Sequence, residues 1–205
     1  MFARAADARI VALCDVDRWR LQFCKENPAA VAVAKRHRFD LDAMKDCFRT
    51  TDFREVLARK DVDAVMITTP DHWHVPIALA AIRAGKDVAC EKPIGLSIAH
   101  GRILADAAAK AKCVFRTDSE FRSIPTWYKA VSLVRTGKIG KLKTIRTVAP
   151  CWNTALPMQP TMPVPEELDY PMWLGPAPLA PYTEKRGHAP KTSTAGYDRP
   201  GSVPY

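Results

Sequence analysis

One stretch, residues 63–97, constrains the fold of this chain more than any other, because it reads as strand, helix and strand in turn. Ala64 to Ile67 is a short apolar run before a Thr-Thr-Pro turn, which predicts a buried strand. Residues 76–85 predict a helix that starts with proline in its first turn and stops at glycine. Asp87 to Cys90 predicts a second strand. A strand, a crossover helix and a strand form a βαβ unit, so the two strands should be parallel.

Polar loops follow both of these strands. The first loop is TPDHWH at residues 69–74, and the second is EKP at residues 91–93. In open parallel sheets, ligands bind beyond the carboxyl ends of the strands. We therefore expect the two loops to lie side by side on one edge of the sheet and to face a shared crevice.

The two loops, with AGK at residues 84–86 between them, resemble those of the glucose-fructose oxidoreductase and inositol dehydrogenase family, also called Gfo/Idh/MocA. The resemblance extends from about residue 9 to residue 182. It implies a Rossmann-type parallel sheet that binds NAD, with NADP as the alternative. It also implies hydride transfer between the nicotinamide and a sugar, inositol or related polyol.

The same patterns predict further elements along the chain. Strands are expected at residues 9–14, 47–50 and 113–116. Helices are expected at residues 17–38, with a break near Asn27, and at 52–59, where Asp52 and Glu55 resemble a capping box. A helix at 98–111 has Ser97 as its N-cap and should turn Ile98, Ile103, Leu104 and Ala108 inward.

Two domains are predicted: an incomplete NAD(P)-binding domain at 1–117 and the beginning of an α+β substrate domain at 118–205. The second starts with a helix at 125–136 and a strand at 141–148. From Pro150 onward it is proline-rich, with 12 of the chain's 17 prolines, and this density predicts irregular structure without a buried helix or central strand.

The Gly-rich phosphate loop of a Rossmann fold lies before the acid that binds the ribose, but the first glycine of this chain is Gly85. The GxGxxG turn and its strand are therefore absent, which predicts a slot about 10 Å wide in the sheet. The family's catalytic aspartate and histidine pair is also absent after residue 187. We expect an incomplete gene product from these two absences.

The resemblance implies a set of site residues. Lys92 is the expected catalytic residue, because an ammonium can stabilise a developing alkoxide or assist proton transfer. It shares the expected substrate contacts with Arg122, for which a salt bridge between domains is the alternative. The expected cofactor-binding residues are Asp15, Arg18, Thr69, Pro70, His72, His74, Glu91, Lys92, Pro93 and Trp173.

Some of these assignments leave alternatives open. Asp15 either accepts hydrogen bonds from the adenosine ribose, which favours NAD over NADP, or caps the next helix. His74 either borders the cofactor or caps the following helix. Trp173 either packs near the nicotinamide or anchors a surface loop. Pro93 should fix its turn, and a cis peptide bond is one of the two forms that this turn can take.

Composition limits the other classes. A formal net charge of +9 without aromatic residues among the basic clusters does not predict a nucleic-acid partner, and no apolar run is long enough to span a bilayer. His72 and His74 lack a third ligand at metal-site spacing, and the six cysteines form no CxxC pair, so no metal is expected. A cytoplasmic location and a homo-oligomer at full length are expected, although an export signal lost with the missing start would change the location.

Three functions therefore remain open from the sequence: a sugar or polyol dehydrogenase, a glycosidase that uses NAD for transient oxidation, and a non-catalytic fragment that lacks the phosphate loop and the catalytic pair.

Overall fold

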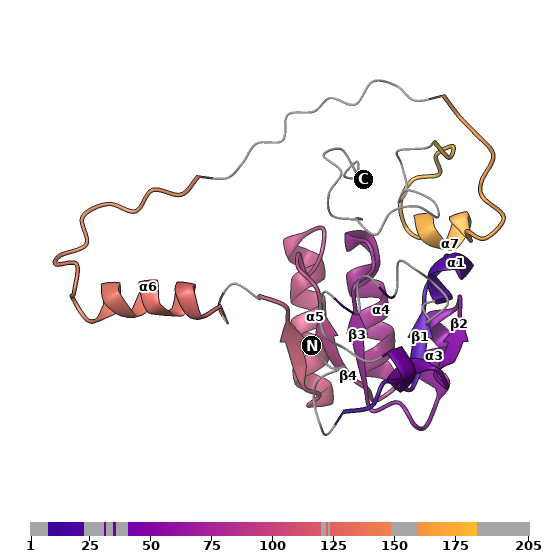
Figure 1. The fold of residues 1–205 in the computed structure, drawn as a ribbon, viewed down its shortest axis with the longest axis horizontal. Coiled ribbons are helices and arrows are strands. Elements are labelled where there is room, and N and C mark those ends of the chain that lie inside the picture. The colour runs from indigo at the N-terminus through magenta and orange to yellow at the C-terminus, as the bar shows by residue number, and fades with distance from the viewer. Residues whose placement is uncertain are drawn as a thin grey trace.

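The computed structural model describes residues 8–22, 31, 35, 41–119, 122, 124–148 and 160–183. Strands and helices alternate through the first part of the chain (Figure 1). The strands are β1 (Ala12–Cys14), β2 (Phe48–Thr50), β3 (Ala64–Ile67), β4 (Asp87–Cys90) and β5 (Phe115–Thr117). The helices are α1 (Arg18–Leu21), the 3-10 helix η2 (Leu41–Met44), α3 (Phe53–Ala58), α4 (Asp71–Arg83), α5 (Ile98–Ala111), α6 (Pro125–Arg135) and α7 (Tyr170–Leu174).

All pairs of described strands are parallel, as the βαβ pattern predicts. β1 pairs with β2, and β4 lies between β3 and β5, with Ile67 opposite Cys90. The described strands form two sheets rather than one, β1–β2 and β3–β4–β5. The division falls between β1 and β3, which is where the sequence predicts a missing strand. The fold is thus a Rossmann-like parallel arrangement that is interrupted at one position.

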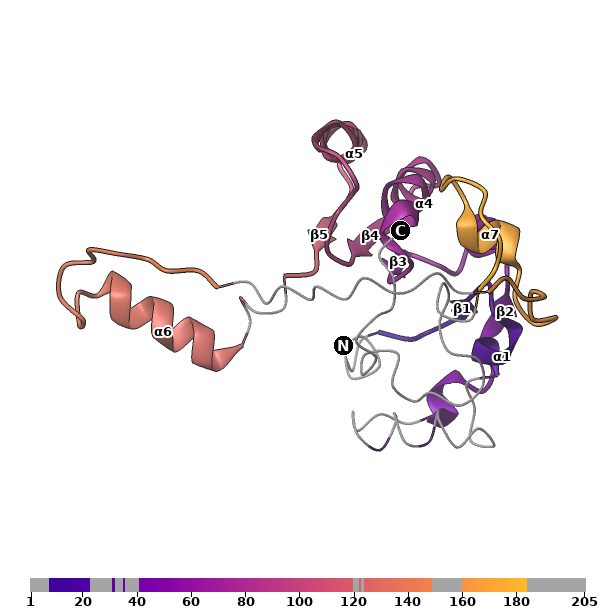
Figure 2. The same ribbon diagram turned by 90° about the horizontal axis from the view of Figure 1, so that it is seen from above.

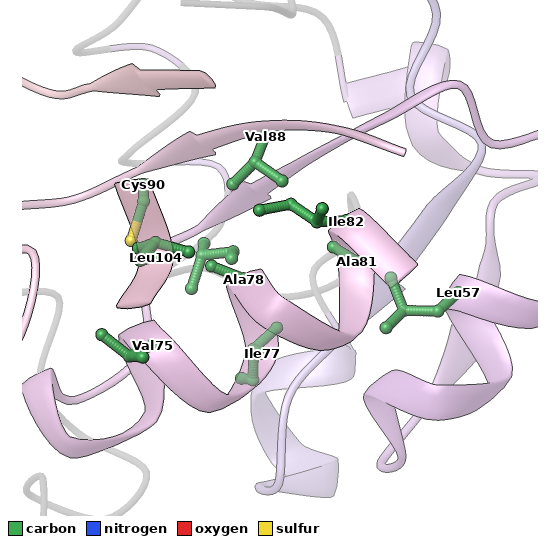
Figure 3. Close-up of a cluster of buried hydrophobic side chains, with 10 residues drawn as sticks. Leu57, Val75, Ile77, Ala78, Ala81, Ile82, Val88, Cys90 and Leu104 are labelled. Atoms are coloured by element: carbon green, nitrogen blue, oxygen red, sulfur yellow. The ribbon is translucent and has the colours of Figure 1, made fainter. Parts of the chain in front are cut away.

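The main core lies between β4 and the helices α3, α4 and α5 (Figure 3). Helix α4 supplies Ile77, Ala78, Ala81 and Ile82, which are buried against Val88, Cys90, Leu57 and Leu104 from the neighbouring elements. The two alanines are fully buried, so α4 approaches the sheet closely. This packing fixes α4 against β3 and β4, and therefore fixes the loops at the carboxyl ends of both strands.

Helix α4 begins earlier than the sequence predicts. It starts at Asp71 with Pro70 at the N-cap, and Pro76 lies inside it. The prediction placed Pro76 in the first turn, because proline is tolerated there without its N–H. In the structure the TPDHWH residues from Asp71 onward are helical, so two of the histidines predicted in a loop belong to the first turns of a helix.

Strand β3 has the predicted bounds, but it is not buried along its length. Ile67 is buried, whereas Ala64 and Met66 are exposed, Met66 to 44%. The reason is that β3 pairs only with β4 among the described strands, so it lies at an edge of its sheet. The apolar run thus predicted the bounds of the strand correctly, but the prediction that the strand is buried is wrong.

Helix α5 has the predicted N-cap. The side chain of Ser97 accepts a hydrogen bond from the backbone N–H of His100. Leu104 is 2% exposed, as predicted, but Ile98 and Ile103 are 95% and 53% exposed. Helix α5 packs on one side only, against α4, so two apolar side chains that were predicted to face inward do not.

Helix α3 has half of the predicted capping box. Asp52 is the N-cap and accepts from the backbone N–H of Arg54. Glu55 does not return a bond to the N-cap residue; it accepts from the hydroxyl of Thr50, which in turn accepts from the backbone N–H of Asp52. Of the predicted helix at 17–38, α1 covers Arg18–Leu21, and the described residues Val31 and Lys35 are also helical. The other residues from 23 to 38 lie outside the described part of the chain.

After β5 the chain forms α6 within the predicted range, but residues 141–148 are exposed and irregular, not a strand. A strand needs a neighbour to satisfy its backbone groups, and none of the described strands pairs with this segment. In both views α6 lies apart from the sheets (Figures 1 and 2).

Residues 160–183, which we call the strap, pack back on the first part of the chain. The strap contains α7, with Pro171 in its first turn, and it buries Leu168, Tyr170, Leu174 and Tyr182. The proline density predicted no buried helix here. Proline in the first turn costs no hydrogen bond, so a five-residue helix forms in spite of it. Figure 2 shows α7 beside α4, and the indole N–H of Trp73 in α4 donates to the carbonyl of Met172 in α7.

Candidate functional site

The candidate site is the edge at the carboxyl ends of β3, β4 and β5. The backbone N–H of Glu91 donates to the carbonyl of Ile67 at 2.9 Å, and the N–H of Asp118 donates to the carbonyl of Cys90 at 2.8 Å. These two bonds continue the parallel pairing past the strand ends. The segments after the three strands therefore leave the sheet side by side, as the sequence predicts for the first two.

Lys92 lies in the loop after β4 and its side chain is exposed. Its backbone N–H donates to the carboxylate of Glu91 at 3.0 Å, so Glu91 contacts the main chain of Lys92. The Lys92–Pro93 peptide bond is cis, the isomer that the sequence analysis considered. An exposed ammonium on a loop fixed beside a strand end is available to a ligand in front of the edge.

His74 joins the two loops. It is 1% exposed, and its ring nitrogens lie 2.6 Å from the carbonyl oxygen of Pro93 and 2.8 Å from that of Thr69. The capping alternative is wrong, because Pro70 is the N-cap and His74 lies inside α4, while its role beside the cofactor stays a prediction. No sequence pattern predicts these two contacts, because the partner Pro93 lies 19 residues further along the chain.

Two polar side-chain atoms at the edge are buried without a hydrogen-bond partner among the described residues, the hydroxyl of Thr69 and one carboxylate oxygen of Asp118. Buried polar atoms are normally satisfied, and exceptions in native proteins are common at ligand sites. A hydroxyl and a carboxylate are suited to the amide and ribose hydroxyls of a nicotinamide nucleotide. The edge therefore fits the nicotinamide half of the cofactor. Asp118 was not among the predicted site residues.

His72 and the neighbouring Trp73 hold the strap against this edge. The Nε2 of His72 lies 2.9 Å from the carbonyl oxygen of Trp173, and the indole N–H of Trp73 donates to the carbonyl of Met172 at 2.8 Å. The ring of Trp173 stacks on Tyr170 with 5.7 Å between centroids and meets His72 edge to face. Trp173 thus lies next to the TPDHWH segment through its strap contacts. The role of Trp73 was missed, although a tryptophan in a polar loop is a signal for such a contact.

The strap also contacts the end of β1, so it spans the position at which the sheet is divided. The N–H of Asp169 donates to the carbonyl of Val16, and the N–H of Arg18 donates to the carbonyl of Glu167. Asp15 accepts from the backbone N–H of Asp17, and Asp17, not Asp15, is the N-cap of α1. The helix-capping alternative for Asp15 is therefore wrong. Its ribose contact remains a prediction, as does the role of Arg18, whose side chain is exposed.

Arg122 is exposed, and its backbone N–H donates to the carbonyl of Ser119. Among the described residues, the structure gives no contact between Arg122 and the Lys92 loop, and neither of its two predicted roles is tested by its position.

Two kinds of site are absent from the described residues. No group of three or more His, Cys, Asp or Glu side chains is arranged to hold a metal ion. No described helix is long and apolar enough to cross a membrane.

The comparisons with known families cover most of the chain. The model of an oxidoreductase family with an NAD-binding Rossmann fold matches residues 1–119, and that of an oxidoreductase C-terminal alpha/beta domain matches residues 148–202. A levoglucosan dehydrogenase from Pseudarthrobacter phenanthrenivorans is 31% identical over 127 residues, which cover 62% of this chain and 31% of that protein. A glycosyl hydrolase family 109 protein from Saccharopolyspora erythraea is 32% identical over 117 residues, which cover 55% of this chain and 23% of that protein.

Among solved structures, scyllo-inositol dehydrogenase from Lactobacillus casei with bound NAD(H) and scyllo-inositol matches with a TM-score of 0.52 and 28% identity. The match covers 68% of this chain and 37% of that one. The chain thus spans about a third or less of the length of the curated relatives it matches.

Proposed function

Because this chain belongs to the oxidoreductase family with an NAD-binding Rossmann fold, we propose that it binds NAD(P) at the carboxyl edge of β3–β4–β5 and transfers a hydride between the nicotinamide and a sugar, inositol or related polyol. The observation that carries the proposal is the position of Lys92. The hydrogen bonds from Glu91 to Ile67 and from His74 to Pro93 hold its loop beside the β3–α4 turn. The Thr69 hydroxyl in this turn is buried and has no hydrogen-bond partner in the part of the chain that the structure describes.

The nicotinamide supplies the hydride acceptor when it is bound. The residues of this chain then have separate roles. Thr69 and Asp118 bind the nicotinamide half through their unsatisfied oxygens. Lys92 lies at the reacting hydroxyl, where its amino group takes up or donates the proton that accompanies hydride transfer and its charge stabilises the alkoxide. Trp173 closes one side of the crevice.

The other half of the cofactor has fewer partners. Asp15, just after β1, would accept hydrogen bonds from the adenosine ribose and would repel a 2′-phosphate, which favours NAD. No residue before Gly85 is a glycine, so no Gly-rich turn in residues 1–84 approaches the pyrophosphate. We therefore expect weaker binding than in a fold that has this turn.

The names of the relatives support the substrate class. One is a levoglucosan dehydrogenase, and the matching inositol dehydrogenase structure contains NAD(H) and scyllo-inositol. A polyol hydroxyl can accept a hydrogen bond from the exposed ammonium of Lys92, which suits this class. Arg122 stays a candidate for the substrate side, and a homo-oligomer stays the proposed assembly of the full-length protein.

A second candidate is a glycosidase that oxidises the sugar transiently with bound NAD, and the similarity to a glycosyl hydrolase family 109 protein favours it. The two candidates share the cofactor and Lys92, but they differ in product. Net NADH formation identifies a dehydrogenase, and sugar release without net NADH identifies a glycosidase.

Calorimetric titration of the chain with NAD+ and NADP+, followed by NADH measurements with levoglucosan and scyllo-inositol, tests the proposal. We expect NAD+ to bind more tightly than NADP+. Lys92→Met should retain NAD+ binding and lose roughly 10²- to 10⁴-fold in turnover, the usual contribution of a general acid or base. Lys110→Met, on the exposed last turn of α5, is the control and should change neither. If the chain binds neither NAD+ nor NADP+, the result would identify it as a non-catalytic fragment.

A further inference from the structure

The ring of His74 faces two groups that can only accept hydrogen bonds. Its Nδ1 lies 2.6 Å from the carbonyl oxygen of Pro93, and its Nε2 lies 2.8 Å from the carbonyl oxygen of Thr69. Carbonyl oxygens have no proton to donate. An imidazole that bonds both oxygens must therefore carry an N–H at both nitrogens, which is the cationic form.

The other arrangements of the ring leave a contact unsatisfied. In either neutral tautomer, one nitrogen directs its lone pair at a carbonyl oxygen at hydrogen-bonding distance, which is repulsive. Turning the ring over would direct C–H groups at the same two oxygens and leave both carbonyls without a strong donor. The side chain is 1% exposed, so water does not replace the missing donors easily. Two charge-assisted bonds, each roughly twice as strong as a neutral one, act against the desolvation of the cation.

The two acceptors belong to different loops. Thr69 precedes α4, and Pro93 follows Lys92 directly. The ring thus connects the β3–α4 turn to the loop that carries Lys92, through one rigid side chain on a packed helix. The charged and titratable groups on these packed segments are Asp71, His72, Glu91, Lys92 and Asp118.

We propose that His74 is a positioning residue that, as a buried imidazolium, donates to Thr69 and Pro93 at once and thereby holds the Lys92 loop against the β3–α4 turn. The effect on catalysis rests on the proposed function of Lys92, but the protonation state and the attachment of the loop do not. The same ring with one proton would leave one of the two loops without its bond.

The direct test is nitrogen NMR of the uniformly labelled full chain at pH 7.5, with the His74 signals identified by their loss in His74→Gln. The expected result is a proton on both ring nitrogens of His74. A His74 ring with one unprotonated nitrogen overturns the proposal. This measurement is made on the unchanged protein, so it does not depend on a variant being fully stable.

Hydrogen exchange tests the attachment of the loop. In His74→Phe, which retains a planar ring without donors, amides of residues 91–96 should exchange roughly tenfold faster or more, the change expected when a buried carbonyl loses its donor. His74→Gln, which offers one donor group, should lie between Phe and wild type. His100→Phe is the control. The proposal is overturned if residues 91–96 are unchanged, or if β3 and β4 accelerate equally with them, which indicates a general core role.

Cofactor binding separates this proposal from the proposed function. If the wild-type chain does not bind NAD+ but the NMR and exchange results are as expected, the attachment by His74 stands and the dehydrogenase assignment fails. If NAD+ binds but the His74 ring carries only one proton, the proposed cofactor binding stands and the proposed attachment by an imidazolium fails.

Discussion

Replacing Gly175 with alanine should detach the strap from the edge of the sheet. Gly175 follows α7 with φ +50° and ψ −124°, and a Cβ at this position would overlap the indole of Trp73. A positive φ costs a residue with a side chain roughly 1–2 kcal/mol. Forcing an extra methyl group into a packed contact costs typically 1–3 kcal/mol more. The sum is about 2–5 kcal/mol, limited by the free energy with which the strap is docked.

Chymotrypsin cleavage after Trp173 and Tyr182 measures this docking, because both residues become accessible when the strap detaches. We expect Gly175→Ala to be cleaved much faster than wild type, with lower stability in urea. Gly101→Ala is the matched control, because Gly101 lies inside α5 with open space around its Cα, and alanine there should add roughly 0.5–1 kcal/mol. Equal cleavage of Gly175→Ala and wild type would refute the close contact between Gly175 and Trp73.

Three further predictions concern the fold. Leu104→Ala should lower the free energy of unfolding, measured in urea, by about 2–5 kcal/mol, because Leu104 is buried. Ile103→Ala, at the adjacent half-exposed position, should lower it far less, and similar losses for both variants would contradict the packing of α5. The hydrogen bond from Arg54 lowers the pKa of Asp52 below its ordinary value of 3.8, so the stability that this N-cap contributes is present at pH 7 and is lost as the pH falls through the lowered pKa. Asp52→Ala should therefore lower the free energy of unfolding by about 1 kcal/mol at pH 7 and by little at pH 2. An equal loss at both pH values would be evidence against this. Burial, with a smaller effect of Glu91, raises the pKa of Cys90 to about 11, so its alkylation at pH 8 should require unfolding, and alkylation of the native protein at the unfolded rate would be inconsistent with this environment.

The local elements were predictable because their signals are local. The Ser97 N-cap and the bounds of β3 and β4 depend on residues within a few positions, and they agree with the structure. The shared edge followed from the parallel pairing of β3 and β4, which a βαβ pattern requires. For this reason the loop positions of Lys92 and Thr69 could be inferred from the sequence alone.

Features that depend on distant partners were not predictable. Periodicity placed Ile98 and Ile103 inward, but the structure packs α5 on one side only. Residues 141–148 alternate like a strand, yet a strand needs a neighbour. The environment of His74 is set by Pro93 across the edge, and the strap contacts of His72 reach 101 residues along the chain. Hydropathy and capping rules contain no information on such contacts.

The central claim is that Lys92 faces bound NAD+ at the carboxyl edge of β3–β4–β5. The most direct test is the rate at which an amine-acylating reagent modifies Lys92, measured by mass spectrometry at increasing NAD+ concentrations, with Lys110 as the internal reference. The account predicts that modification of Lys92 slows as NAD+ rises through its dissociation constant while that of Lys110 stays constant. Equal rates at Lys92 with and without saturating NAD+ would contradict it.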